Sequence, residues 1–454
     1  MNGIMKKYLI ILMAVLVSGS VSGAREAGRY LITDFGAKAD TSVLSTGAIQ
    51  KAIDRCSEAG GGKVIVPAGK FKTGTIVLKD NVWLEVSLGA TLYGSTRFED
   101  YPFIPYDIVG RTTQKPNYQL ILAQNVNNVG LCGEGTIDGQ GGLFPKIKGS
   151  QGGHIRPILI RMVKCANVTV RDLNLRNAAR WMEHYLCCDN VRITGLRIFN
   201  RSNYNNDGLD VDGCHNVVIS DIICDSDDDG IVFKSTTPRL CENVSVTNCV
   251  ISSHCSAIKF GTETNGGFRN FAISNCVIKP SESPERVWWG REKGLGGLTL
   301  AIADGGVMDG ILINNISITG TQAPVYIRLC NRATPYDAAA PRPGVGSLRN
   351  VIISNVRATD ASTMGCSITG IPGHPVENIL LRDVSIEFQG GVDPEKITSE
   401  PEEWENRYPE CTNFGTLPSF GFFVRHARGV KFENVTLTTT LPDHRPSIIK
   451  IDTE

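Results

Sequence analysis

Short runs of alternating apolar and polar residues recur along most of the chain and predict β-strands rather than helices. Runs such as "VTVRDLNLRN", "VRITGLRIFN" and "VVISDIICDS" are rich in β-branched residues and end in Asn or Ser. Four consecutive intervals between the Asn-Val-like phrases in the middle of the chain are 23, 26, 27 and 27 residues long. A near-constant period of this length, built from short strands, predicts a solenoid. The phrases begin at Asn128, Asn167, Asn190, Asn216, Asn243, Asn270, Asn350 and Asn378.

The predicted fold is all-β: a single-domain right-handed parallel β-helix spanning residues 25–454. One coil cannot bury its apolar face alone, so successive coils must stack. A β-sandwich would use hairpins with two-residue turns, and the sequence lacks those signals. A propeller needs four strands per repeat, which is more than this period accommodates.

One helix and three loops interrupt the pattern. Residues 46–59 place Ile49, Ala52, Ile53 and Cys56 on one helical face, and three glycines follow. We expect this helix to cap the N-terminal end of the solenoid. The longer intervals at about 281–306, 334–348 and 389–422 are predicted to be loops, which often build the binding face of a solenoid.

The first 24 residues are typical of an export signal. Lys6 and Lys7 precede an apolar run, and Ser22-Gly23-Ala24 supplies a small-residue cleavage site. The run is too short for a membrane span, so we expect a secreted or periplasmic protein without membrane insertion. Of the 14 cysteines, Cys165, Cys188, Cys214 and Cys241 recur in the phrase Cys-x-Asn-Val and are expected in the core, while pairing of Cys187, Cys255 or Cys411 stays open.

Charge composition narrows the set of partners. Lys plus Arg and Asp plus Glu number 46 each, so no net charge favours nucleic acid or a membrane surface. We expect a monomer.

Candidate chemistry is densest in "NNDGLDVDGC" and "DSDDDGIVFKS". Asp207 and Asp228 are 21 residues apart, close to one coil, which places them on one face of adjacent coils. Paired carboxyl groups with room for a water are what an inverting glycosidase needs, and crowding raises the pKa of one of them. Calcium binding and simple Asp-rich turns are the competing interpretations.

These motifs resemble glycoside hydrolase family 28, the polygalacturonase family. "NND" at residues 205–207, "DDDGIVFKS" and "NAARWMEHYLCCDNV" are similar to family motifs, and the resemblance covers about residues 31–437. It implies hydrolysis of galacturonate-containing linkages in pectic polysaccharides, with inversion and no cofactor or metal. It also implies Asp228 as general acid, and Asp207 with Asp229 as the groups that hold and deprotonate the attacking water.

The resemblance also links four other residues to the site, through the motifs in which they lie. Asn205 belongs to the first motif, Lys234 lies in the strand after the second, and Trp181 with His184 belongs to the third. Lys234 is either a ligand of a substrate carboxylate or a solvated strand lysine, and Trp181 is expected in the cleft. Trp288, Trp289, Trp404 and Tyr408 either stack on sugars or anchor their loops.

The sequence departs from the family pattern twice. Where the family has Gly-His-Gly, this chain has "SSHCSAIKF", so that His254 or Ser256 occupies the place of the family histidine. The family's Arg-Ile-Lys clamp is replaced by "GGLTLAIADGG". An anionic sugar still requires a cation, and the remaining candidates are Lys259, Arg291, Lys293 and Arg328. The substrate is therefore left open between polygalacturonan, rhamnogalacturonan and a side-chain uronide.

Two other classes of function stay open. A calcium-dependent pectate-type lyase would use the acidic cluster for the metal and release unsaturated products. A non-catalytic carbohydrate-binding β-helix would bind without turnover. The sequence does not decide between endo and exo action, although long loops beside the cleft favour exo.

Overall fold

The structure is a computed structural model that describes residues 28–113, 117–147, 155–281 and 293–454. The predicted signal segment, residues 1–24, lies outside these ranges, as do Trp288, Trp289 and Arg291. Within the described ranges, no helix is both long and apolar enough to cross a membrane. The domain boundary at residue 25 therefore stays a prediction.

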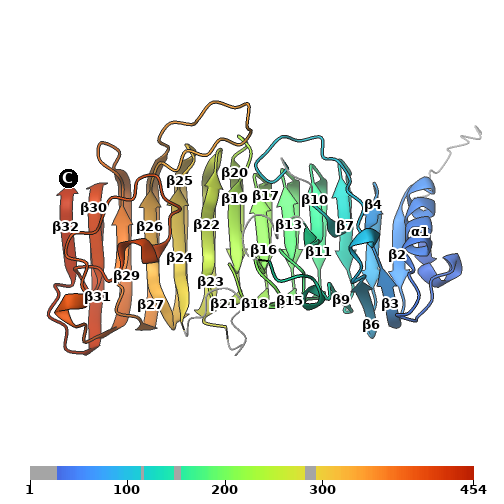
Figure 1. Ribbon diagram of the computed structural model, residues 1–454, viewed down its shortest axis with the longest axis horizontal. Helices are drawn as coiled ribbons and strands as arrows, with labels where there is room; N and C mark the ends of the chain where they lie inside the picture. Colours follow the sequence, from blue (N-terminus) through green and yellow to red (C-terminus); the bar gives the residue numbers. More distant parts are fainter. Residues whose placement is uncertain (1–27, 114–116, 148–154, 282–292) are drawn as a thin grey trace, which may run out of the picture.

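The described strands stack in parallel into one 32-stranded sheet that winds as a right-handed parallel β-helix, as predicted (Figure 1). Each coil contributes strands to three rows. The first row contains β1 (Gly28–Leu31), β2 (Gly62–Val66), β5 (Val82–Val86), β8 (Gly130–Cys132), β11 (Ala166–Arg171), β14 (Asp189–Thr194), β17 (His215–Ser220) and β20 (Cys241–Thr247). The second contains β3 (Gly69–Thr73), β6 (Ala90–Gly94), β9 (Thr136–Asp138), β12 (Asn174–Arg176), β15 (Arg197–Asn200), β18 (Ile223–Ser226) and β21 (Val250–Ser253).

Toward the C-terminus the first two rows merge into long strands, which are β23 (Gly267–Lys279), β25 (Val307–Thr319), β27 (Ser347–Ala361), β29 (Val376–Gly390) and β31 (Lys431–Leu441). The third row runs the length of the molecule. It contains β4 (Ile76–Leu78), β7 (Gln119–Gln124), β10 (Ile158–Val163), β13 (Glu183–Leu186), β16 (Leu209–Asp212), β19 (Ile231–Ser235), β22 (Ser256–Thr264), β24 (Gly294–Ile302), β26 (Thr321–Leu329), β28 (Cys366–Thr369), β30 (Phe422–Arg428) and β32 (Ile448–Thr453).

A ladder of asparagines explains the recurring Asn-Val phrase. The side-chain amide of Asn216 donates to Asn190 at 3.1 Å, and that of Asn243 donates to Asn216 at 3.2 Å. The same bond joins Asn167 to Asn128 and Asn270 to Asn243. Each of these asparagines has a φ between 55° and 58°, a left-handed conformation that Asn tolerates better than other residues with a Cβ atom. The phrase thus turns the chain and ties each coil to the next.

The interior of the solenoid is apolar, and the predicted cysteine ladder lies in it. Cys165, Cys188, Cys214 and Cys241 are all buried in the main core. The cysteines whose pairing the sequence left open, Cys187, Cys255 and Cys411, are also buried thiols.

The predicted capping helix is confirmed. Helix α1 (Thr46–Glu58) buries Ile49, Ala52, Ile53 and Cys56 against the first coils, and Gly60 and Gly61 follow with positive φ. Short 3-10 turns occur at η1 (Ile32–Phe35), η2 (Phe98–Asp100), η3 (Gly141–Leu143), η5 (Pro394–Lys396) and η6 (Cys411–Phe414).

Two of the three predicted loops are confirmed and one is partly wrong. No strand lies between β26 and β27, or between β29 and β30, in the part of the chain that the structure describes. Within 281–306, however, strand β24 is buried along all nine of its residues. Because this strand is rich in glycine, its sequence does not show the apolar alternation of a strand. The glycines allow close packing, since a Cβ at Gly297 would lie 2.7 Å from the carbonyl oxygen of Pro324.

Candidate active site

Asp207 and the Asp228–Asp229 pair lie on adjacent coils, at the start of neighbouring strands in the third row. Leu209 pairs with Ile231 and Ile231 pairs with Ile258. The N–H of Gly208 donates to the Asp229 carbonyl, and the N–H of Gly230 donates to the Ser256 carbonyl, both at 2.9 Å. The predicted juxtaposition of the two acidic motifs is confirmed, with Asp229 as the positional equivalent of Asp207.

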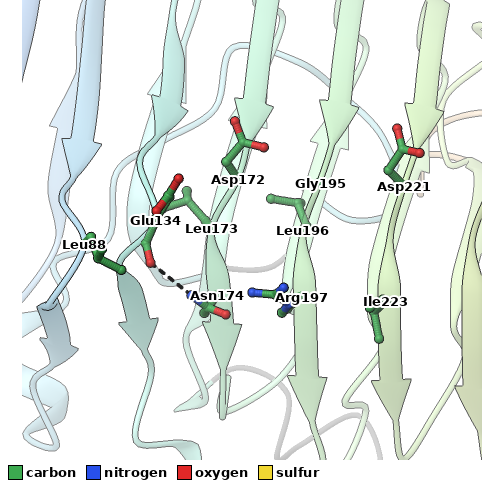
Figure 2. Close-up of a pocket in the computed structure, with 10 residues that line it drawn as sticks. All are labelled: Leu88, Glu134, Asp172, Leu173, Asn174, Gly195, Leu196, Arg197, Asp221 and Ile223. Atoms are coloured by element: carbon green, nitrogen blue, oxygen red, sulfur yellow. Dashed lines mark hydrogen bonds between the residues drawn. The ribbon is translucent and has the colours of Figure 1, made fainter.

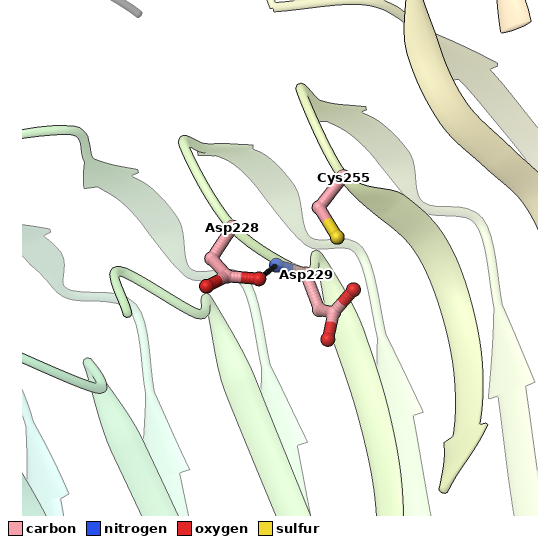
Figure 3. A group of neighbouring side chains, drawn as sticks. All are labelled: Asp228, Asp229 and Cys255. Atoms are coloured by element: carbon pink, nitrogen blue, oxygen red, sulfur yellow. Dashed lines mark hydrogen bonds between the residues drawn. The ribbon is translucent and has the colours of Figure 1, made fainter. Parts of the chain in front are cut away.

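The acidic pair is buried beside a thiol. Figure 3 shows Asp228 and Asp229 on one turn with the Cys255 side chain beside them. The backbone N–H of Asp229 donates to Asp228 Oδ1 at 3.0 Å. Asp207, Asp228 and Asp229 are respectively 4%, 7% and 3% exposed, so their charges are poorly screened by water.

Burial and mutual repulsion favour protonation in this cluster. Burial, followed by the negative charge of Asp229, raises the pKa of Asp228 to about 7, against the opposing effect of Lys259. Burial and the neighbouring Asp210 and Asp228 raise the pKa of Asp207 well above its usual range. A carboxyl that remains protonated near neutral pH has the property required of a general acid.

Asp229 has the opposite surroundings, because it is paired with a lysine. Its Oδ2 accepts from Lys259 Nζ at 2.7 Å, and its Oδ1 accepts from the N–H of Ser256 at 3.1 Å. Lys259 Nζ also donates to the hydroxyl of Tyr408 at 3.0 Å. Asp229 and Asp228 therefore lie side by side with different partners: Asp229 forms an ion pair with Lys259, and Asp228 forms none in the described residues.

His254 lies next to the pair but contacts a different acid. Its Nδ1 is 3.0 Å from Asp227 Oδ1, and it is 1% exposed. Ser256 occupies the position equivalent to Asp229 on the next coil. The structure therefore places His254 two residues before the strand and Ser256 at its start, and a catalytic role for His254 stays a prediction.

Lys234 belongs to a cationic cluster around Glu263. Its Nζ lies 3.5 Å from Glu263 and 3.6 Å from Asp210. Glu263 is also approached by Arg332 at 3.7 Å and Arg111 at 3.9 Å. Although burial opposes ionisation, these three cations lower the pKa of Glu263 to about 2. Asp304 pairs with Arg332 as well.

Trp181 and His184 pack edge to face, with ring centroids 5.0 Å apart. His184 Nε2 lies 3.1 Å from Asp212 Oδ2, and complete burial lowers the pKa of His184 to about 4. Trp181 is 8% exposed, with Lys234 Nζ 5.3 Å from its ring centroid. Asn205 Oδ1 accepts from Arg156 at 3.0 Å. Trp181 therefore lies beside Lys234, one of the cations around Glu263.

Arg328 is buried and holds the loop between β29 and β30. Its guanidinium donates to the Gly370 carbonyl at 2.8 Å, to Thr369 at 3.2 Å and to the Glu403 carbonyl. In the same loop, the guanidinium carbon of Arg407 lies 3.3 Å from the centroid of the Trp404 ring. These contacts explain both side chains as anchors of the loop. They give no support to substrate binding by Arg328, and Lys293 is likewise engaged, with Asp360.

The ligand atoms of Asp228, Asp229 and Cys255 lie within 4.8 Å of one another, a spacing that a metal ion accepts. One observation disfavours a metal here, because a cation already contacts the pair. Lys259 already occupies Asp229 Oδ2. We therefore interpret the cluster as an acid/base site.

A separate groove of about 530 Å³ lies at the turns between the first and second rows, away from Asp207, Asp228 and Asp229. Figure 2 shows Asp172, Gly195 and Asp221 at three successive turns, with Arg197 on the strand after Gly195 and Ile223 on the strand after Asp221. It lacks the acid and base pair found on the third row, so we place the chemistry on that row.

Sequence reasoning missed several members of the site. Arg111, Glu263 and Arg332 come from a loop, a strand end and a second loop, and no motif links them. Tyr408 was noted only as an aromatic residue, and it is 149 residues from Lys259. Only the path of the loop between β29 and β30 brings the two together.

The fold and the site define a parallel β-helix protein with a buried carboxylate cluster of the acid/base type. A model of the family "Glycosyl hydrolases family 28" matches residues 56–405, and the chain belongs to this family.

The chain is 34% identical over 214 residues to a probable polygalacturonase of Vitis vinifera, covering 45% of this chain and 44% of the relative. It is 30% identical over 251 residues to an exo-poly-alpha-D-galacturonosidase of Dickeya chrysanthemi, covering 44% and 41%. The matched regions thus span less than half of either relative. An exopolygalacturonase structure from Thermotoga maritima has a TM-score of 0.68 at 22% identity, covering 91% of this chain and 92% of that one, and shares its fold.

Proposed function

We propose that the protein is a glycosidase that hydrolyses galacturonate-containing linkages of pectic polysaccharides with inversion of configuration. The observation that carries the proposal is the pair of adjacent, unlike carboxyl groups: Asp228 with its pKa raised to about 7 and Asp229 paired with Lys259. Family membership and the names of the two relatives support this activity.

In the proposed reaction, Asp228 donates its proton to the glycosidic oxygen as the bond to the anomeric carbon breaks. Asp229, the carboxylate paired with Lys259, accepts the proton of a water that attacks from the opposite face of the sugar, and Asp207 helps to hold that water. The step leaves Asp228 deprotonated and the base protonated, and proton exchange with solvent restores both groups. No cofactor is needed for this step.

Recognition of the uronate is assigned to the cationic cluster around Glu263. Arg111, Lys234 and Arg332 approach a carboxylate that already exists in the protein, and a second carboxylate from the substrate suits the same donors. This cluster replaces the Arg-Ile-Lys clamp that the sequence lacks. Trp181 is the surface on which we expect a sugar ring to pack.

The test is product analysis with wild type and Asp228→Asn on homogalacturonan and on rhamnogalacturonan. Wild type is expected to release saturated uronides, with or without a chelator, and the variant should lose about 10²–10⁴-fold in kcat. Proton NMR of the first products reports the anomeric configuration. Unsaturated, chelator-sensitive products would indicate a lyase instead, and equal turnover by the variant would remove Asp228 from the mechanism.

We also propose that residues 1–24 are removed on export and that the mature chain acts as a secreted or periplasmic monomer. Mass spectrometry of the exported protein tests the cleavage, and light scattering tests the monomer. An uncleaved N-terminus on the exported protein would contradict the first.

A further inference from the structure

We propose that Lys259 is a positioning residue of the acid/base pair, which holds Asp229 as the ionised base and so leaves the transferable proton on Asp228. The inference rests on the proposed function, and it changes the role that the sequence suggested for Lys259, which was to bind the substrate.

The first argument is the geometry of the ion pair. Lys259 Nζ lies 2.7 Å from Asp229 Oδ2, and the two side chains are 3% and 5% exposed. A buried charge pair at this distance is poorly screened, so the lysine strongly favours the charged carboxylate. Asp228, on the same turn, makes no ion pair in the described structure, so the proton shared by the two acids resides on Asp228.

The second argument is that Lys259 is held from the far side. Its Nζ donates to Tyr408 at 3.0 Å and lies 5.4 Å from the centroid of that ring. Tyr408 is in the loop between β29 and β30, which is itself anchored by Arg328 and Arg425. A lysine with two fixed partners is oriented toward Asp229 rather than toward a sugar in the cleft.

The third argument is the electrostatic surroundings of the pair. Although burial opposes its ionisation, Asp229 and Tyr408 raise the pKa of Lys259 well above its usual range, so it stays charged across the working pH range. The other titratable and charged groups that act on the pair come from three directions. They are Asp227 on the same turn, Asp207, Asp210, Lys234 and Arg156 on the side of the preceding coils, and Cys255, Glu410 and Tyr408 on the other side.

The experiment compares pH–rate profiles of wild type, Lys259→Met and Lys259→Arg on the same galacturonate oligomer. Loss of the cation should move the acidic limb of kcat upward by about one to three pH units and lower kcat at least tenfold, with KM within about twofold of wild type. Lys259→Arg keeps the charge and should restore most of the profile. Lys63→Met, which removes a more exposed lysine–carboxylate pair at the N-terminal end of the solenoid, is the control for loss of a lysine away from the site.

A raised KM with unshifted limbs would show that Lys259 binds substrate, and would overturn the proposal. A pH–rate profile of Lys259→Met that is the same as that of wild type would also overturn it. If Lys259→Met does not fold, Tyr408→Phe decides: a smaller shift in the same direction supports the proposal, and no shift refutes it. Failure of the proposed function is a separate result, because it would show as full turnover by Asp228→Asn.

Discussion

The interior of the solenoid contains one carboxyl whose removal should stabilise the protein. Glu183 pairs with Ile160 and Leu209 in an inward-facing position and is completely buried. Its Oε1 accepts from the Tyr185 hydroxyl at 2.6 Å. Burial, only partly opposed by that hydrogen bond, raises the pKa of Glu183 from 4.5 to about 8. The folded protein therefore retains a proton that the unfolded chain releases at neutral pH.

The sign and size of the effect follow from this difference. The contribution of Glu183 to the free energy of unfolding is most favourable below pH about 4.5. It becomes less favourable as the pH rises toward about 8, because only the unfolded state releases the proton in this window. Each pH unit costs about 1.4 kcal/mol, so the loss at pH 7 is about 3 kcal/mol as an upper estimate. Glu183→Gln is neutral in both states and can still accept from Tyr185.

Chemical denaturation of wild type and Glu183→Gln at about pH 4 and about pH 7 measures the effect. The variant should gain stability relative to wild type as the pH rises. The difference between their free energies of unfolding should be about 3 kcal/mol larger at about pH 7 than at about pH 4. Comparing the two pH values cancels the difference in packing between acid and amide. Glu99→Gln, at a side chain that is 74% exposed, is the control and should show no such difference. A stability difference that does not change with pH would refute the reasoning.

Three further outcomes are expected. The basic limb of kcat should fall as pH rises through about 7, because Asp228 must be protonated to act as the acid; a rate that stays flat to about pH 9 would contradict this assignment. Arg111→Met should raise KM for galacturonate oligomers about tenfold with little change in kcat, measured by initial rates; a fall in kcat alone would argue against a binding role. Asn216→Ala should cost about 2 kcal/mol in chemical denaturation, because it breaks the ladder bonds and places a Cβ at a φ of 57° without the amide. Asn216→Gly should cost less, and equal losses would leave the φ argument unsupported.

The architecture was predictable because a solenoid repeats its local rules. The Asn-Val phrase marks each turn, and stacking its members at a constant register reproduces the ladder that the structure shows. The capping helix was equally readable from its single apolar face and the glycines after it. The same constancy of register predicts Asp207 beside the Asp228–Asp229 pair, as the structure shows.

What escaped prediction depends on contacts between distant segments. Strand β24 was hidden because its glycine-rich sequence lacks the alternation of a half-buried strand, while burial on both faces makes it a strand. The inward direction of Glu183 follows only from its register with Leu209.

The sequence by itself determined the coil, the cap and the acidic motifs, since each is set by residues within one or two turns of the repeat. Only the tertiary structure decided which lysine or arginine forms an ion pair with which carboxylate. Lys259 could have faced a sugar, and it meets Asp229 and Tyr408 because a loop from over a hundred residues away crosses the same row of strands. The path of a loop depends on packing between distant segments, and the spacing of residues along the chain does not predict it.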